Sequence, residues 1–469
     1  MPYLGKEPRS PEFSTSAKTS AYTVVAVDDA STILCSAASA DYAVALTAAA
    51  TLGDGFTVTL KKSDATKFMI TINPNSTETI DGLPDLKLRQ EHASVTLICD
   101  GSNWHIVDHS NVEVPTNIAE NSGFNVDQYG HITRTGVGDA TELLQDRWRI
   151  TPAGSASARW TYSQENNGGI NGDSQWGKLL NTTADASPGS AEGQGFGQSV
   201  IGNTSIQLLG TDNKFENAVL SMDIIVHKGG SSSISLPAKI PLFFATIDGT
   251  QYQYAEDVSL AAVDTWYRVS IVVPEHASAN LVPGIQRSCI FGIGLYGGSG
   301  VQETSGTWAT GYEPYATGTS SNLADATGNY VGIANVVFQP GQIASPYQVR
   351  SYSEELARCR YFYERLIPNT ASNQSIFQAY NVTSTVASGI FNYAHKRAAP
   401  TLTFTAGSTF EVRHQTTTTV CTAAAVSGSS DEDRCLCNFT VSSGLTGGQG
   451  CIIRRNDSDT TYVEVSAEL

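Results

Sequence analysis

Only one segment of this chain has the pattern of a strong helix, and this constrains the fold more than any other feature. Ser351 and Glu354 have the spacing of a capping box, in which each side chain bonds the other residue's backbone N–H. Acidic residues come first and basic residues follow, which is the order that a helix dipole favours. One apolar stripe recurs at helical spacing, formed by Leu356, Cys359, Tyr363 and Leu366. Since Pro368 stops the pattern, we predict an amphipathic helix over 352–366, packed on a β body.

The rest of the chain alternates apolar and polar residues in short runs, separated by turn residues. Phe56, Val58 and Leu60 show this period of two, and Asp100-Gly101 is typical of the turns between runs. We therefore predict an all-β protein in six parts. These are an N-terminal arm (1–20), a small β domain (21–110), a linker (111–142), a central β-sandwich (143–350), a connecting helix (351–368) and a C-terminal β tip (369–469).

The central sandwich is predicted from its longest apolar runs and the Gly- and Ser-rich loops between them. The clearest strands are expected at 218–227, 265–274, 289–296 and 329–338. The tip should carry shorter strands at 401–404, 409–412, 436–441, 451–453 and 462–465. No period of 20–50 residues repeats along the chain, which argues against a solenoid or a propeller.

Charge and composition exclude several kinds of partner. There are 45 acidic and 28 basic side chains, for a formal charge of −17, and such a surface repels nucleic acid and anionic membranes. No apolar run of about 18 residues occurs, so no spanning helix is expected. The first eleven residues lack an apolar core, so we expect no signal peptide and synthesis in a cytoplasm.

The cysteines leave alternatives open. Cys35, Cys99, Cys289 and Cys359 stand among apolar neighbours, as buried thiols do. Cys421, Cys435, Cys437 and Cys451 fall in the tip with the spacing C-x13-C-x-C-x13-C. They could be reduced thiols, disulfides formed after release, or metal ligands. Because structural zinc sites favour pairs with two to four intervening residues, reduced thiols are the preferred interpretation, and no metal or other cofactor is expected.

Motifs for catalysis are weak, and we assign no catalytic residue. Gly292 to Gly297 matches Gly-x-Gly-x-x-Gly, but the Gly-rich residues that follow cannot form the helix a dinucleotide site requires. We therefore expect a strand that runs into a loop. Paired carboxylates for glycoside hydrolysis cannot be identified from sequence, because they need to be close only in space.

Aromatic residues in turn-rich stretches are the best candidates for a binding site. Trp148 and Trp266 have strand-like neighbours and should be buried. The candidate ligand-binding residues are Trp176, Trp308, Tyr312 and Tyr315. Their rings could pack on the flat C–H faces of sugars while Asn, Gln and Asp side chains bond the hydroxyls. Burial in a sandwich core is the alternative for each of the four.

Three segments resemble modules of bacteriophage tail fibres. The string Arg350-Ser-Tyr-Ser-Glu-Glu-Leu-Ala-Arg-Cys359, with the strand before it, is similar to a module that closes a jelly-roll domain in those proteins. Residues 54–104 resemble a small β domain of phage fibres. Asp146-Arg-Trp148, Asp264-Thr-Trp-Tyr-Arg268 and Trp308 follow one another as in the carbohydrate-binding-module-like jelly roll of tail fibres.

The resemblance implies a non-enzymatic fibre or spike of a virion that binds a polysaccharide on its host. It also implies a homotrimer, contacts with other virion proteins through the N-terminal region, and release from the host bacterium by lysis. Two alternatives stay open, namely a capsule or lipopolysaccharide depolymerase on the same scaffold, and a purely structural head or tail component.

Overall fold

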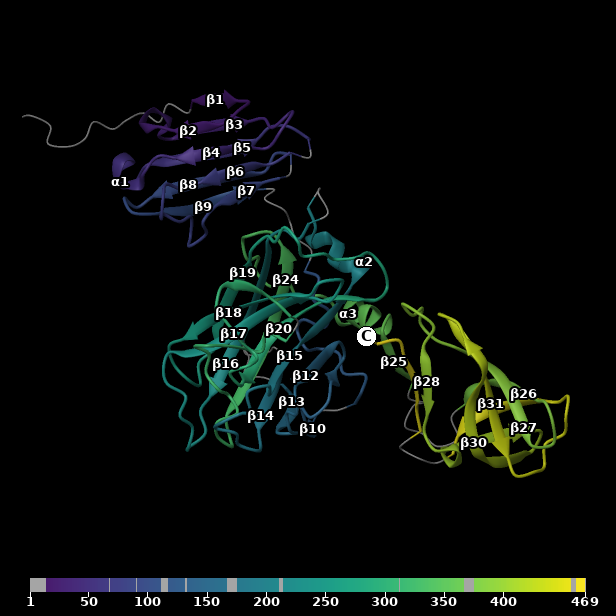
Figure 1. The fold of residues 1–469 in the computed structure, drawn as a ribbon. Coiled ribbons are helices and arrows are strands. Elements are labelled where there is room, and N and C mark those ends of the chain that lie inside the picture. Colours follow the sequence, from purple (N-terminus) through teal and green to yellow (C-terminus); the bar gives the residue numbers. More distant parts are fainter. Residues whose placement is uncertain are drawn as a thin grey trace, which may run out of the picture. The chain divides into compact units, whose positions relative to one another are not determined.

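The computed structural model describes residues 14–66, 68–89, 91–110, 117–130, 133–166, 175–210, 214–311, 313–366, 375–456 and 461–468. Strands account for 49% and helices for 6%, which confirms the predicted all-β class. The elements are labelled in Figure 1. The chain divides into two compact units. We call the first the coil unit, because its strands wind as a short parallel β-solenoid, and it comprises Met1–Thr116, Gly210–Val219 and Gln339–Ser345. The remainder forms the large unit.

The coil unit consists of two facing sheets between which the chain alternates. The first sheet has the order β1 (Thr15–Lys18), β3 (Ser31–Cys35), β5 (Thr57–Lys62), β8 (Ser94–Cys99) and β9 (Trp104–Ser110). The second has the order β2 (Tyr22–Val24), β4 (Tyr42–Leu46), β6 (Ile70–Asn73) and β7 (Leu86–Leu88). Two short helices connect strands, η1 (Ala26–Asp28) and α1 (Ala49–Leu52).

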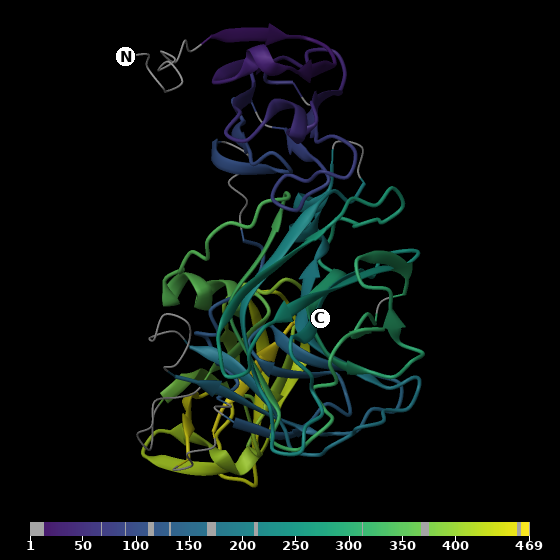
Figure 2. The ribbon, with the colours of Figure 1, turned by 90° about the vertical axis from the view of Figure 1, so that its left-hand side faces the viewer.

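The first six strands, β1 to β6, pair in parallel within their sheets. They therefore form successive turns of a short parallel β-solenoid (Figures 1 and 2). This unit is a short solenoid, which the absence of a sequence repeat had wrongly predicted against. Thr15 pairs with Thr32, 17 positions on, whereas Ser31 pairs with Val58, 27 positions on. Because the turns differ in length, they leave no fixed period in the sequence. The predicted arm also ends earlier than expected, since β1 lies within it.

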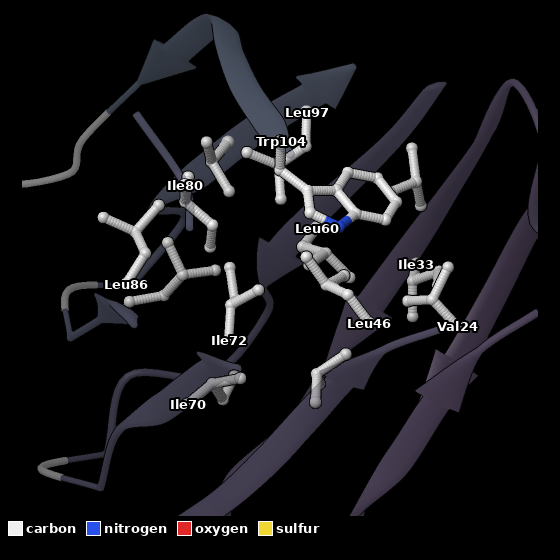
Figure 3. Packing of buried hydrophobic residues seen from close by; sticks show 14 of the residues in the cluster. Val24, Ile33, Leu46, Leu60, Ile70, Ile72, Ile80, Leu86, Leu97 and Trp104 are labelled. Carbon is white, nitrogen blue, oxygen red and sulfur yellow. The ribbon is translucent and has the colours of Figure 1, made fainter. Parts of the chain in front are cut away.

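The alternation of apolar residues builds the core between the two sheets of the coil unit. Val58 and Leu60 are fully buried members of this core. Leu60 lies among buried side chains of both sheets, including Ile33 and Leu46 (Figure 3). Trp104 is also fully buried and meets Phe56 edge to face, with ring centroids 5.9 Å apart. Ile343, from the segment that joins this unit late in the chain, packs against the same cluster.

The large unit contains the predicted sandwich. Its six-stranded sheet has the order β10 (Thr133–Val137), β13 (Trp160–Glu165), β14 (Trp176–Asn181), β24 (Tyr330–Pro340), β16 (Ala218–His227) and β19 (Tyr267–Val273). Its seven-stranded sheet has the order β11 (Glu142–Gln145), β12 (Trp148–Ala153), β15 (Gly193–Ile201), β20 (Arg287–Gly297), β17 (Ala238–Thr246), β18 (Tyr252–Leu260) and β22 (Thr307–Thr310). Short elements in the connections are α2 (Gly202–Ser205), η2 (Ile206–Leu208), β21 (Gln302–Glu303) and β23 (Ala316–Thr317).

Stacked aromatic rings fill the space between the two sheets. Trp148 stacks on Phe124 and on Phe196, with ring centroids 4.8 and 5.5 Å apart, and the three side chains are at most 1% exposed. Phe124 lies in the segment that the sequence suggested was a linker. From residue 117 onward the described part of that segment is built into the sandwich, and β10 is one of its strands. Gly292 lies inside β20, as expected for a strand that runs into a loop.

The predicted helix is shorter than expected. α3 covers Tyr352–Arg360, and the Ser351 hydroxyl accepts a hydrogen bond from the backbone N–H of Glu354 at 3.3 Å, as the capping pattern predicts. The chain then turns and continues as β25 (Tyr363–Leu366), which pairs with the strand near the C-terminus. Tyr363 is therefore a strand residue, and pairing with a distant strand prevails over the helical pattern. Pro368, the expected stop, lies outside the described residues.

The tip is a closed barrel with a small sheet beside it. The barrel order is β26 (Ser375–Asn381), β27 (Val386–Asn392), β31 (Arg434–Val441), β30 (Thr417–Ser430), β29 (Phe410–His414) and β32 (Gly450–Arg455). The small sheet comprises β25, β33 (Val463–Ser466) and β28 (Thr401–Phe404), and η3 (Gly407–Thr409) precedes β29. All eight cysteines of the chain are buried free thiols, and the sulfur atoms of Cys435 and Cys437 are 3.2 Å apart.

Helix α3 is anchored to the sandwich by a buried carboxylate. Glu355 is 3% exposed, accepts a hydrogen bond from the backbone of Asn121, and lies 3.1 Å from the Arg350 guanidinium. Among the described helices, none is long and apolar enough to cross a bilayer.

Candidate functional site

The outer face of the six-stranded sheet carries a group of aromatic rings. Side chains alternate along β14, so Leu179 points to the core with its partner Tyr162, whereas Trp176 and Lys178 point away from it. Tyr330 lies on the same outer face, because it pairs with Leu180 of β14. We call this surface the aromatic platform. It comprises Trp176, His227, Trp266 and Tyr330.

The four rings of the platform contact one another. Trp176 and Trp266 meet edge to face, with ring centroids 5.4 Å apart. The ring centroids of Trp176 and Tyr330 are 6.5 Å apart. His227 stacks on Tyr330 at 4.8 Å with an interplanar angle of 12°. Trp176 is only 9% exposed and supports the group, while Trp266 and Tyr330 are half-buried. A side chain at Gly332 would place its Cβ 2.5 Å from the Trp176 ring, so only glycine leaves room for this arrangement.

Charged side chains border the platform. Lys178 Nζ lies 4.8 Å from the centre of the Tyr330 ring and 3.6 Å from Glu165. His227 Nδ1 is 2.6 Å from an Asp264 carboxylate oxygen. The pKa of the Tyr330 hydroxyl is raised, first by burial and then by the negative charges of Asp264 and Glu165. The hydroxyl therefore stays protonated at neutral pH and can donate a hydrogen bond.

This arrangement suits a particular shape of ligand. The ring faces favour a flat, weakly polar surface. Lysine, carboxylate and tyrosine groups at the border offer hydrogen-bond donors and acceptors, and bonds to charged groups are the stronger ones. The platform could therefore hold a flat ligand that is apolar on one face and rich in hydroxyls at its edge.

The four residues proposed from sequence do not form one site. Trp176 belongs to the platform, but it is largely buried there. Tyr312 lies outside the described residues. Trp308 lies at the edge of the sandwich between the two sheets. Tyr315 lies on the outer face of the seven-stranded sheet, against Phe243.

Trp308 closes the edge of the sandwich. It lies in β22 and pairs with Tyr254, which in turn pairs with Phe244, so these side chains share the face that points toward the other sheet. Its ring meets the buried Phe244 edge to face at 6.0 Å. Its Nε1 donates a hydrogen bond of 3.1 Å to the carbonyl of Pro274, just after the edge strand β19. The half-buried ring thus bridges the two edge strands, with His276 beside it at 4.9 Å.

Tyr315 was expected in an exposed loop, and the structure contradicts this. Its side chain is fully buried on the outer face of the seven-stranded sheet, 5.5 Å from the Phe243 ring. Gly195 lies beneath it, and a Cβ there would be only 2.4 Å from the Tyr315 ring. The glycine on β15 therefore allows the segment that carries Tyr315 to lie close against the sheet.

Sequence reasoning missed three members of the platform. Trp266 was expected in the core, yet it is only half-buried and lies next to Trp176. Tyr330 and His227 stand in strands that were predicted well, but no face could be assigned to them. Gly332 was an available signal, because a glycine two positions after Tyr330 in a strand marks a close approach of another side chain.

No metal centre is evident among the residues that the structure describes. No three His, Cys, Asp or Glu side chains gather there so that they could hold a metal ion.

Comparisons with known proteins give weak similarities. No protein-family model matches the chain, and no curated protein sequence matches it. A Clostridium thermocellum xylanase 10B fragment, with CBM22-1 and GH10 modules and xylohexaose, is 12% identical over 45% of this chain and 30% of that chain, with a TM-score of 0.22. The module TmCBM61 with β-1,4-galactotriose is 11% identical over 47% of this chain and 97% of that chain, with a TM-score of 0.21.

A third similar structure is a tripod from the baseplate of bacteriophage Tuc2009. It is 11% identical over 52% of this chain and 62% of that chain, with a TM-score of 0.20. This chain thus spans less than a third of the xylanase fragment and less than two thirds of the tripod protein. At TM-scores between 0.20 and 0.22, these similarities carry no conclusion about function.

Proposed function

We propose that the protein is a fibre or spike of a bacteriophage or phage-like particle that attaches to a glycan on the host surface. The observation that carries the proposal is the aromatic platform with its charged border. A pyranose ring can lay its C–H face on Trp266, while its hydroxyls bond the Tyr330 hydroxyl, Lys178, Glu165 and Asp264. Each aromatic contact with the sugar should contribute about 1–1.5 kcal/mol, by analogy with other aromatic contacts.

The virion assignment is supported by the resemblance of three sequence segments to phage tail fibres. In this proposal the N-terminal region attaches to other virion proteins, and the protein is made in the host bacterium and released by lysis. The fibre resemblance also leads us to propose a homotrimer. Mass measurement in dilute solution tests that part, and a stable monomer of 49.8 kDa at micromolar concentration would contradict it.

An array of bacterial surface polysaccharides tests the binding. We expect the wild-type chain to bind a subset of the glycans, and Tyr330→Ala and Trp266→Ala each to weaken that binding about tenfold, which is the factor for roughly 1.4 kcal/mol. Their melting temperatures should change little, because both rings lie on an outer face.

Tyr380→Ala is the matched control, because Tyr380 is an aromatic residue of the barrel that is 52% exposed. It should bind as the wild type does. If Tyr380→Ala loses binding while both platform variants keep it, the binding surface belongs to the barrel and the platform assignment is wrong.

We further propose that the protein does not cleave its ligand. Incubation with each bound polysaccharide should release no reducing ends. Their release would instead identify a depolymerase. A chain that binds no glycan and no host cell would favour a purely structural virion component.

A further inference from the structure

A pocket of the large unit lies at one end of the seven-stranded sheet and shares no residue with the aromatic platform. Its volume is about 320 Å³, within the range of sites that bind small molecules. Three connections form it, namely the loop between β14 and β15, the residues after β20, and the segment between β23 and β24. We call it the loop pocket, and its lining includes Ala186, Gly298, Ser299, Gln302, Ser321 and Asn322.

Hydrogen bonds between the connections hold the walls of the loop pocket in place. The backbone N–H of Gly298 donates to the carbonyl oxygen of Glu192 at 2.7 Å. The side-chain amide of Asn322 donates to the carbonyl oxygen of Asp185 at 2.8 Å. The walls are therefore already ordered in the free protein, so a ligand does not have to supply the free energy of ordering them.

A glycine lets two of the walls lie close together. A Cβ at Gly298 would be only 1.9 Å from the carbonyl oxygen of Gly189, so any other residue would push the two loops apart. Gly298 belongs to the Gly-rich run after Gly297, which cannot form the helix of a dinucleotide site. In the structure this run forms one wall of the loop pocket instead.

The lining of the loop pocket is polar but uncharged. Among the described residues that line it, none has a charged or aromatic side chain. Ser321 Oγ accepts a hydrogen bond from the backbone N–H of Lys239 at 3.0 Å, and within the described chain no acceptor takes its own proton. Gln302 donates from Nε2 to the carbonyl oxygen of Gly297 at 2.9 Å, which leaves its side-chain oxygen available. The Ser299 hydroxyl is exposed at the rim.

We propose that the loop pocket binds one unit of a neutral sugar. A sugar ring carries hydroxyls on several sides, and these can donate to and accept from serine, glutamine and asparagine side chains. A charged group would lose water in the pocket without meeting an opposite charge, which is unfavourable. The formal charge of −17 repels acidic sugars further. The pocket is thus a second site for a glycan, and it does not depend on the platform.

Ligand-observed NMR titrations of the full chain test the proposal, with glucose, galactose and mannose as probes. They are carried out on Trp266→Ala, so that binding to the platform is weakened. At least one of the three hexoses should bind, and the uronate of that hexose should bind at least tenfold more weakly. Adding Ala186→Trp fills the pocket and should abolish hexose binding, with an unchanged melting temperature, because Ala186 is exposed. Adding Gln302→Ala should weaken it several-fold.

Two matched controls test whether the effects are local. Ala184→Trp places the same ring at an exposed position of the same loop, outside the pocket lining, and should leave hexose binding unchanged. Gln378→Ala removes an exposed glutamine of the barrel and should also leave it unchanged.

The outcomes separate the loop pocket from the platform. The proposal is overturned if none of the three hexoses binds, if the uronate binds as tightly as its hexose, or if Ala186→Trp keeps hexose binding. A failure of the platform would leave the hexose titrations of Trp266→Ala as expected. A failure of the loop pocket would leave the loss of polysaccharide binding in Trp266→Ala as expected, so the two proposals fail independently.

Discussion

At the scale of single residues, burial changes the behaviour of groups whose sequence context looks ordinary. Asp146 is 1% exposed and accepts two hydrogen bonds from Gln128, from the backbone N–H at 2.5 Å and from Nε2 at 2.6 Å. Burial raises the pKa of its carboxyl to about 7, and the negative charges of Glu468 and Asp127 act in the same direction. In the unfolded chain the pKa should be about 4.

This difference predicts a dependence of stability on pH. Between pH 4 and 7 the folded state keeps a proton that the unfolded state has lost, so the contribution of Asp146 is fully present below about pH 4 and is lost as the pH rises to about 7. The loss should approach about 1.4 kcal/mol per pH unit. We expect the free energy of unfolding of the wild type, minus that of Asp146→Asn, to fall over this interval and then to level off. A difference that stays constant from pH 4 to 7 would show that Asp146 is ionised in the folded protein.

Glu355 shows what sequence can and cannot reveal about one residue. The capping pattern at Ser351 and Glu354 correctly located the start of the helix. The charge order of the helix marked Glu355 only as one of the acidic residues at its start. In the structure its carboxylate is buried against Arg350 and Asn121. Asn121 is more than 200 positions away in the sequence, so only the folded chain brings these partners together.

At the scale of elements, the strands of the sandwich were predicted well, because each is a long apolar run between Gly-rich loops. The expected strand at 218–227 coincides with β16, and that at 289–296 lies within β20. The face that each side chain occupies was harder to predict. In β14 and β24 both faces carry apolar residues, so the period of two that distinguishes core from surface is absent, and the platform could not be derived from the sequence.

Two tryptophans near strand edges allow a prediction at this scale. Trp308 bridges β22 and β19 and packs on the buried Phe244, whereas Trp266 lies on an outer face against Trp176. We expect Trp308→Ala to lower the free energy of unfolding by about 2–3 kcal/mol, less than for a fully buried tryptophan. Trp266→Ala should cost about 1 kcal/mol or less. Chemical denaturation of the two variants measures both values.

Glycan affinity should separate Trp266 and Trp308 in the opposite way from stability. Trp266→Ala should lose most of the glycan affinity, and Trp308→Ala, under conditions where it is folded, should keep it. The sequence favoured the opposite assignment, because Trp308 stands among turn residues and Trp266 in a strand-like run. If Trp308→Ala lost glycan affinity without losing stability, the glycan-binding site would lie at the edge of the sandwich, around Trp308.

At the scale of the whole molecule, the parallel coil was the least predictable part. Its apolar alternation correctly predicted a small β domain, but alternation does not say whether neighbouring strands pair in parallel or antiparallel. The coil unit also recruits Ile343 and Gln342, and the Gln342 amide donates a hydrogen bond of 2.9 Å to the side chain of Asp85. More than 250 positions separate these two residues, so no local pattern could reveal the pairing.

The separate cores of the two units lead to the last prediction. Leu60 is fully buried in the coil unit, and Phe439 is fully buried in the barrel of the large unit. Each substitution by alanine removes buried surface and leaves a cavity, at a cost of about 3 kcal/mol. Because the units have their own cores, scanning calorimetry should show more than one transition. Leu60→Ala should lower the temperature of one transition and Phe439→Ala that of another, and glycan binding should survive in Leu60→Ala below its own transition. If either variant instead shifts all transitions together, the two units unfold as one cooperative body, and the binding surface then depends on the coil unit for its stability.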